Sequence, residues 1–123
     1  SFFRIEKRSI DMKKEILFPY HHGLQIWSMI HGIISGTPIE RLDALVRTGA
    51  LEQSFANDVK EAMNVVLGLY IRLKHGQAKR GEELSNILPF AVLSTREKEE
   101  LVISMKLLKE MQNKIFLHFR MRM

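Results

Sequence analysis

Two long runs of apolar residues constrain the fold of this chain more than any other feature of its sequence. The first run comprises Phe55, Val59, Ala62, Val66, Leu69 and Leu73, and the second comprises Leu101, Met105, Leu108, Met111, Ile115 and Phe119. Spacings of four and three residues place side chains on one face of an α-helix. The sequence therefore predicts one long helix over residues 54–75 and another over residues 94–120, each with a buried face.

Start signals locate two of the expected helices. Ser94 stands three residues before Glu97, and Thr37 stands three residues before Glu40, so each pair matches a capping box. Pro38 follows at the first helical position, where the missing N–H of proline costs nothing. We expect a short helix here that stops near the glycine at position 49, while a glycine at position 76 ends the long helix.

A further helix is predicted over residues 20–34, beginning beside Pro19. Apolar side chains recur on more than one side of this segment, which is typical of a helix that is buried on most sides. The glycine-containing segment "SGTP" is expected to end it. Because Trp27, Met105 and Met111 stand at core spacing, we interpret them as packing residues rather than as a ligand groove.

The first eighteen residues are too charged for a clear helix prediction, and we expect an extended lead-in with a short strand or turn. Residues 76–89 are expected to form a polar connection, since they contain two glycines and a proline. The predicted fold class is all-α: an antiparallel helical bundle of three long helices plus a short one. We expect a single domain over residues 1–123, with the lead-in over 1–18 and the bundle over 19–120.

Composition excludes several classes of protein. The chain has no cysteine, so disulfides, thiolate metal sites and a thiol nucleophile are ruled out, and a reducing cytoplasm is the expected location. No secretory leader and no apolar run of membrane-spanning length is present, so we expect no membrane partner. Since the sequence begins with Ser1, it is expected to be a piece of a longer polypeptide.

The basic balance does not by itself indicate a nucleic-acid partner. The formal net charge is +5, and the isoelectric point is near 9.7. Arg72, Lys74, His75, Lys79 and Arg80 concentrate part of this charge. They could bind a phosphate-bearing ligand or an acidic partner, but a solvated helix C-terminus is the favoured interpretation, because no aromatic residues interleave them for base stacking.

No constellation of residues predicts chemistry within this chain. A nucleotidyltransferase site needs clustered carboxylates that hold a divalent metal ion, usually after a Gly-Ser turn, whereas Asp11, Asp43 and Asp58 are isolated from one another. His22 and His31 could share a helix face, but they lack a third ligand at suitable spacing. We therefore expect no catalytic site, no metal and no cofactor in this domain.

The chain resembles a known family over about residues 10–119. The resemblance lies in the order of five motifs: "IDMKK", "PYHHGLQIWSMIHGI", "GTPIERLDAL", "YIRLKHGQ" and "LSTREKEELVISMKLLKEMQ". The family is the nucleotidyltransferase substrate-binding domain, which lies downstream of a catalytic domain similar to the protein-PII uridylyltransferase. The matching positions are Asp11, Met12, Lys13, Pro19, His22, Gly23, Thr37, Arg41, Leu42, Arg72, His75, Leu93, Ser94 and Gln112. Gln25 departs from the pattern, because the family has an arginine there.

The resemblance implies a helical accessory domain that completes the substrate or acceptor site of an upstream nucleotidyltransferase domain in the same polypeptide. It implies Mg²⁺ and a nucleoside triphosphate for that catalytic domain, and an acceptor protein as a further partner. The substrate-binding residues that it implies are Asp11, Lys13, His22, Arg41, Arg72 and His75. Structural roles are the alternative for two of them: Arg41 would pair with Glu40 or Asp43, and Asp11 would cap a turn.

Two other functions stay open at this stage. The bundle could be a regulatory module that transmits signals from upstream CBS or cyclic-nucleotide-binding domains, or that forms a homodimer through its methionine-rich last helix and through Phe2 and Phe3. A nucleic-acid-binding bundle that uses residues 72–80 is the less favoured alternative.

Overall fold

The structure, a computed structural model, describes residues 8–122, with the side chains of 8–121. This part of the chain contains four α-helices, two short strands, a π-helical turn and a 3₁₀ turn (Phe90–Val92). The helices are α1 (Phe18–Ile30), α2 (Pro38–Arg47), α3 (Gln53–Lys79) and α4 (Thr95–Arg122), and the strands are β1 (Ser9–Asp11) and β2 (Ile87–Pro89). The predicted class, a helical bundle of three long helices and a short one, is confirmed.

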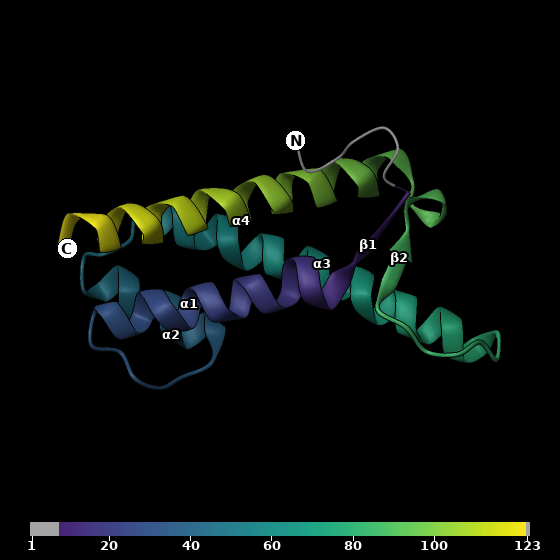
Figure 1. Cartoon of the computed structure of the whole chain (residues 1–123), viewed down its shortest axis with the longest axis horizontal. Coiled ribbons are helices and arrows are strands. Elements are labelled where there is room, and N and C mark those ends of the chain that lie inside the picture. Colours follow the sequence, from purple (N-terminus) through teal and green to yellow (C-terminus); the bar gives the residue numbers. More distant parts are fainter. Residues whose placement is uncertain (1–7, 123) are drawn as a thin grey trace.

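The helices lie lengthwise against one another (Figure 1). Helix α3 runs in the opposite direction to α1 and α4, whereas α1 and α4 run in the same direction. Helix α2 packs against α1 and α3 at one end of the bundle. The two strands lie at the other end, where α3 ends and α4 begins.

The core confirms the interpretation of the apolar runs. Trp27 is 4% exposed, Met105 3% and Met111 0%, so all three are packing residues. Tyr20 is also buried, and its hydroxyl donates a hydrogen bond of 2.5 Å to the backbone carbonyl of Ser104, which joins α1 to α4. The bundle therefore closes on a continuous apolar centre to which all four helices contribute.

Both predicted capping boxes are present. The Thr37 hydroxyl accepts from the Glu40 N–H at 3.2 Å, and Glu40 accepts from the Thr37 N–H at 2.9 Å. Ser94 and Glu97 repeat the arrangement at 3.1 and 2.8 Å. Because these contacts satisfy backbone donors that the helix itself leaves free, they determine where α2 and α4 begin.

The predicted ends of two helices are wrong. Helix α1 ends at Ile30 rather than at residue 34, and α3 ends at Lys79 rather than at residue 75. The glycines that end them are Gly32, with φ +77°, and Gly81, with φ +68°. Each lies just beyond its helix, in a left-handed conformation that glycine adopts at little cost. Gly76 instead lies inside α3.

The expected extended lead-in is wrong for its second half. Residues Lys13–Leu17 form a π-helical turn that leads directly into α1, and the Phe18 N–H donates to the Lys13 carbonyl. Pro19 explains this turn, because its ring lacks an N–H and collides with the carbonyl four residues earlier in a regular α-helix. A wider turn before the proline avoids that collision.

The first half of the lead-in forms the predicted short strand, and its partner was not predicted. Strand β1 pairs antiparallel with β2, with Ile10 opposite Leu88. Two flanking hydrogen bonds extend the pairing, from Met12 N–H to the Asn86 carbonyl at 2.8 Å and from Phe90 N–H to the Arg8 carbonyl at 3.0 Å. The connection over residues 76–89 is therefore not simply polar, since it contributes the end of α3 and a strand.

Candidate functional site

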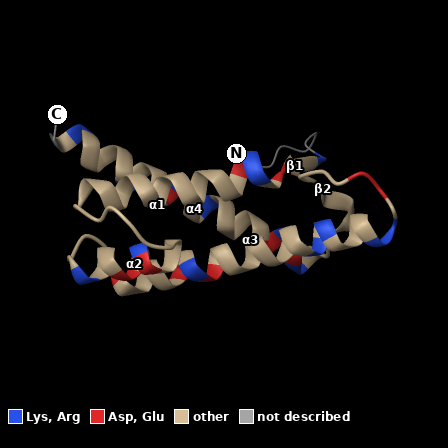
Figure 2. Cartoon of the chain, turned by 90° about the horizontal axis from the view of Figure 1, so that it is seen from below, with Lys and Arg blue, Asp and Glu red and all other residues tan. Residues whose placement is uncertain are grey.

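Helix α1 lacks charged side chains, although its surface is partly exposed. No Asp, Glu, Lys or Arg occurs from Ile16 to Ile39. Helices α2 and α3, in contrast, carry acidic and basic residues along their length (Figure 2). A surface without charge is unusual on a helix that faces only water, because soluble helices normally present polar residues to solvent.

The exposed side of α1 consists of residues at helical spacing. Phe18 is 48% exposed, Ile26 44% and Met29 64%, and His22 stands between the first two. Positions 18, 22, 26 and 29 lie on one side of a helix. We call this stripe, together with Phe116 and Phe119 of α4 beside it, the α1 face. A contiguous apolar surface of this kind marks an interaction site more often than a surface for solvent.

A groove runs along the α1 face between α1 and the C-terminal half of α4, with a volume of about 780 Å³. Phe18, His22 and Ile26 line one side of it, and Gln112, Phe116 and Phe119 line the other. Gly23 forms part of its floor, where the helices are so close that a Cβ atom would lie 2.7 Å from the Met111 methyl group. The absence of a side chain at Gly23 therefore allows this close contact.

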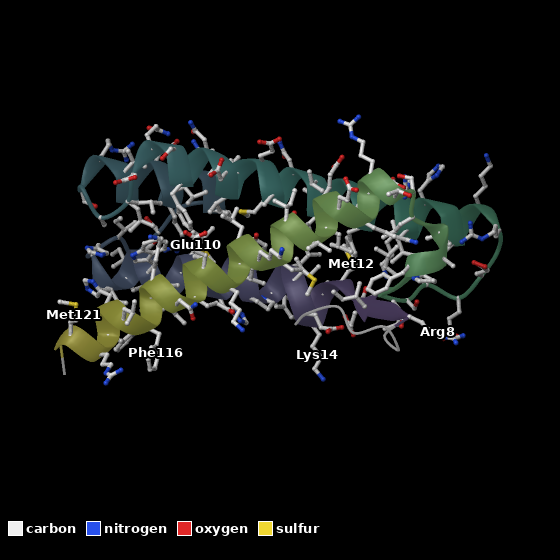
Figure 3. The ribbon with its side chains drawn as sticks, turned by 90° about the horizontal axis from the view of Figure 1, so that it is seen from above. Arg8, Met12, Lys14, Glu110, Phe116 and Met121 are labelled. Atoms are coloured by element: carbon white, nitrogen blue, oxygen red, sulfur yellow. The ribbon has the colours of Figure 1, made fainter. Side chains whose placement is uncertain are left out.

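Few polar groups reach the groove. Of its described lining residues, only Lys14 carries a formal charge. Lys13, beside it in the sequence, holds its ammonium 5.6 Å from the centre of the Phe18 ring. The His22 ring stacks on Phe18, with centroids 5.9 Å apart and an interplanar angle of 17°. Lys14 and Phe116 project from the same side of the bundle (Figure 3).

A second apolar recess, of about 680 Å³, lies on the other side of Phe18, between α1, α2 and α3. Its apolar lining includes Leu17, Pro38, Ile39, Met63 and Leu67. Phe18 lines both recesses and therefore forms the ridge between them. The α1 face thus combines a ridge with two flanking hollows, which is a shape that a protein surface can match.

Two of the six predicted site residues have structural roles. The Asp11 carboxylate accepts from the Lys14 N–H at 3.0 Å, so it caps the first helical turn, as its structural alternative predicted. Arg41 is 9% exposed, and its guanidinium donates to the carbonyls of Gly36 and Ile33 at 2.9 and 3.4 Å. The expected pairing of Arg41 with Glu40 or Asp43 is therefore wrong, because Arg41 fastens the loop between α1 and α2.

Arg72 and His75 lie on α3, and neither lines the groove. Arg72 forms an ion pair with Glu97, which joins α3 to the start of α4. The hydrogen bond from Arg72, followed by the one from the Ser94 N–H, lowers the pKa of Glu97 to about 2. His75 is exposed. Of the six candidates, Lys13 and His22 both lie against the Phe18 ring.

The basic segment at the end of α3 is largely paired with neighbours. Arg72 contacts Glu97, Arg80 contacts Glu82 at 2.9 Å, and the Lys74 ammonium lies 5.3 Å from the centre of the Tyr70 ring. These contacts support the interpretation of a solvated helix end, where cations also complement the helix dipole.

The histidines do not form the metal pair that the sequence raised as an alternative. The His31 ring lies 4.9 Å from that of His118 rather than beside His22. Within residues 8–122, no three His, Cys, Asp or Glu side chains are grouped closely enough to hold a metal ion. The same part of the chain contains no helix long and apolar enough to cross a membrane.

The sequence indicated part of the groove and missed the rest. Pro19, His22, Gly23 and Gln112 belong to the motifs of the family resemblance, and all four line the groove. Phe116 was not predicted as a surface residue, although it is 63% exposed. The absence of Asp, Glu, Lys and Arg from residues 16–39 is the sequence signal that could have located the α1 face.

Comparison with known proteins identifies the family but provides no characterised relative. No curated protein and no solved structure matches the chain. A family model described as "Putative nucleotidyltransferase substrate binding domain" matches residues 2–119, which is nearly the whole sequence. The chain belongs to this family of nucleotidyltransferase substrate-binding domains.

Proposed function

We propose that this chain is a non-catalytic accessory domain that docks through its α1 face on a nucleotidyltransferase catalytic domain and completes its substrate or acceptor site. The observation that carries the proposal is the uncharged stripe of Phe18, Ile26 and Met29, whose side chains are 44–64% exposed. Covering such side chains removes apolar surface from water, which drives most protein association.

The chemistry belongs to the catalytic domain in this proposal. We place that domain upstream in the same polypeptide, in the cytoplasm, and expect it to resemble the protein-PII uridylyltransferase, with a protein as acceptor. Nucleotidyl transfer needs Mg²⁺ that carboxylates hold, and the Mg²⁺ also positions the nucleoside triphosphate. Both ligands are assigned to the catalytic domain, and this chain supplies a surface rather than reacting groups.

Nucleotide transfer by the joined domains tests the proposal. The catalytic domain, fused to this chain, would be supplied with labelled UTP or ATP and a PII-type acceptor protein. Phe18→Asp is expected to lower the transfer rate at least tenfold, because it places a charge in the contact. Ile103→Asp is the matched control, since Ile103 is 64% exposed on α4 and does not line the groove. Equal rates for both variants and the unaltered chain would refute the proposal.

A regulatory or dimerisation module is the second candidate. The observation that favours it is the C-terminal end of α4, where Leu117 is 54% exposed and Met121 88% exposed. In this alternative the domain passes signals from CBS or cyclic-nucleotide-binding domains without contacting substrate. Light scattering tests the dimer, and a monomer at high concentration would exclude it. Phe2 and Phe3, which suggested this alternative in the sequence, lie outside the described residues.

A further inference from the structure

We infer that the groove between α1 and α4 receives an amphipathic α-helix of the nucleotidyltransferase catalytic domain, with acidic side chains at one end of its apolar stripe. The inference rests on the proposed function, since it names the chemistry of the element that the α1 face contacts.

The shape of the groove fits a helix. Its lining extends from Lys14 to Ile26 along the helical segment and from Gln112 to Phe119 along α4. At about 1.5 Å per residue, the α1 side alone offers roughly 18 Å, which is the length of about three helical turns. The two walls are neighbouring helices that run in the same direction (Figure 1), so they offer parallel ridges between which a third helix can pack.

The lining selects an extended apolar ligand over a small one. Phe18, Ile26, Phe116 and Phe119 supply the exposed apolar surface, and Phe116 alone is 63% exposed. A pocket for a small molecule typically surrounds 70–90% of the ligand surface. This groove is open along its length between two helices, and the exposed stripe continues past it to Met29. An amphipathic helix covers such a stripe with side chains at positions i, i+4 and i+7.

Charge argues for acidic side chains on the partner helix. Lys14 is the one formally charged residue among the described lining residues, and Lys13 lies next to it over the Phe18 ring. Both are exposed. A carboxylate on the incoming helix would gain attraction at this end of the groove, whereas a basic helix would be repelled. A second copy of this chain is the weaker occupant, because its own groove brings the same lysines and its net charge is also +5.

The test uses three designed helical peptides of about sixteen residues. The first carries leucines at i, i+4, i+7 and i+11, with glutamates near one end of this stripe. The second replaces those glutamates by lysines, and the third keeps the composition of the first but scrambles the stripe. Each is titrated into the ¹⁵N-labelled chain at low ionic strength, and affinity and perturbed amides are recorded by NMR.

The acidic peptide is expected to bind at micromolar to submillimolar concentration and to perturb the amides of residues 18–26 and 112–119. Lys14→Glu should weaken it about fivefold and should improve the lysine peptide by a similar factor. Lys79→Glu is the matched control, because Lys79 is an exposed lysine at the end of α3 and does not line the groove. It should leave both affinities unchanged.

Three results would overturn the inference. The first is no binding of the acidic peptide at a peptide concentration of 1 mM, which corresponds to a binding free energy of about 4 kcal/mol or less. The second is equal affinity for the acidic and the lysine peptides. The third is that dilution of the chain alone changes the same amide signals as the peptide does, which would identify a second copy of the chain as the occupant. If these peptides fail while Phe18→Asp still lowers the rate of nucleotide transfer, the docking function stands and only the helical, acidic occupant is wrong.

Discussion

Replacement of Tyr20 by phenylalanine should weaken the contact between α1 and α4 without changing its shape. Tyr20 is 1% exposed, and its hydroxyl donates to the Ser104 carbonyl at 2.5 Å, across 84 residues of sequence. Tyr20→Phe removes one hydrogen bond and leaves the ring in place. A buried hydrogen bond contributes about 1 kcal/mol, and the desolvated partner adds to its loss, so we expect the free energy of unfolding to fall by about 1–2 kcal/mol.

The same variant predicts a dependence on pH. Burial raises the pKa of Tyr20 well above the ordinary tyrosine value of 10.0. Above pH 10 the tyrosine of the unfolded chain ionises while that of the folded chain stays protonated, so unfolding becomes easier. Tyr20 therefore makes its full contribution to the free energy of unfolding below pH 10. As the pH rises toward the pKa of Tyr20 in the folded chain, this contribution falls by up to about 1.4 kcal/mol per pH unit. Phenylalanine cannot ionise, so only the unaltered chain loses this stability. The difference in free energy of unfolding between the unaltered chain and Tyr20→Phe should therefore be about 1.4 kcal/mol smaller at pH 11 than at pH 7.

Urea denaturation followed by circular dichroism at pH 7 and at pH 11 measures both effects. Tyr70→Phe is the matched control, because the Tyr70 hydroxyl donates to the Asn86 side chain at 2.9 Å and Tyr70 is only partly buried. At pH 7, Tyr70→Phe should lower the free energy of unfolding by less than Tyr20→Phe does. The reasoning would be refuted if Tyr20→Phe were as stable as the unaltered chain at pH 7. It would also be refuted if the difference in free energy of unfolding between the two were the same at pH 7 and at pH 11.

Four further substitutions test other parts of the structure by the same denaturation measurement. Arg41→Ala should cost about 2 kcal/mol, because it removes the donors that hold the loop carbonyls, and unchanged stability would contradict that role. Gly68→Ala should stabilise α3 by about 0.5–1 kcal/mol, since a Cβ there meets nothing within 4 Å. Gly23→Ala should stabilise the chain less than Gly68→Ala does, because the new Cβ would collide with the Met111 methyl group. Equal stabilisation by both substitutions would show that α1 and α4 are not in close contact at Gly23. Glu97→Gln should be less stable at pH 7; because hydrogen bonds lower the Glu97 pKa to about 2, this advantage exists above pH 4.5 and should vanish as pH falls toward 2. A gap that persists at pH 2 would count against the role of the carboxylate.

Helix type and number could be predicted from the sequence, because a buried face imposes a period of 3.6 residues on apolar side chains. The capping boxes at Thr37 and Ser94 could also be predicted, since their contacts are local. Helix ends marked by glycine were less predictable. Gly76 and Gly81 are both plausible ends of α3, and only the backbone conformation, a φ of +68° at Gly81, distinguishes them.

Non-local pairing explains the missed strand. Strand β2 consists of three residues and becomes a strand because Ile10 lies opposite Leu88 in the folded chain. Three residues are too few to show a period of two, so no pattern predicted it. The π-helical turn before Pro19 is a similar case, because the sequence shows the proline but not whether the chain bends, breaks or widens there.

The candidate site was only partly predictable, since helical periodicity does not say what covers an apolar stripe. Phe119 belongs to the run that predicted a buried face, yet it is 48% exposed and lines the groove. A stripe that faces another molecule has the same spacing as one that faces the core. The family motifs indicated polar residues, and among these Arg41 proved to hold a loop whereas His22 lies at the groove.

Amide hydrogen exchange tests the docking of the α1 face most directly. The chain would be compared alone and joined to its nucleotidyltransferase catalytic domain, with exchange followed by mass spectrometry. Docking through the α1 face predicts slower exchange in residues 18–29 and 112–119 of the joined protein, with little change in residues 96–106 on the other half of α4. Protection confined to α3, or no protection of residues 18–29, would contradict the proposal that the α1 face contacts the catalytic domain.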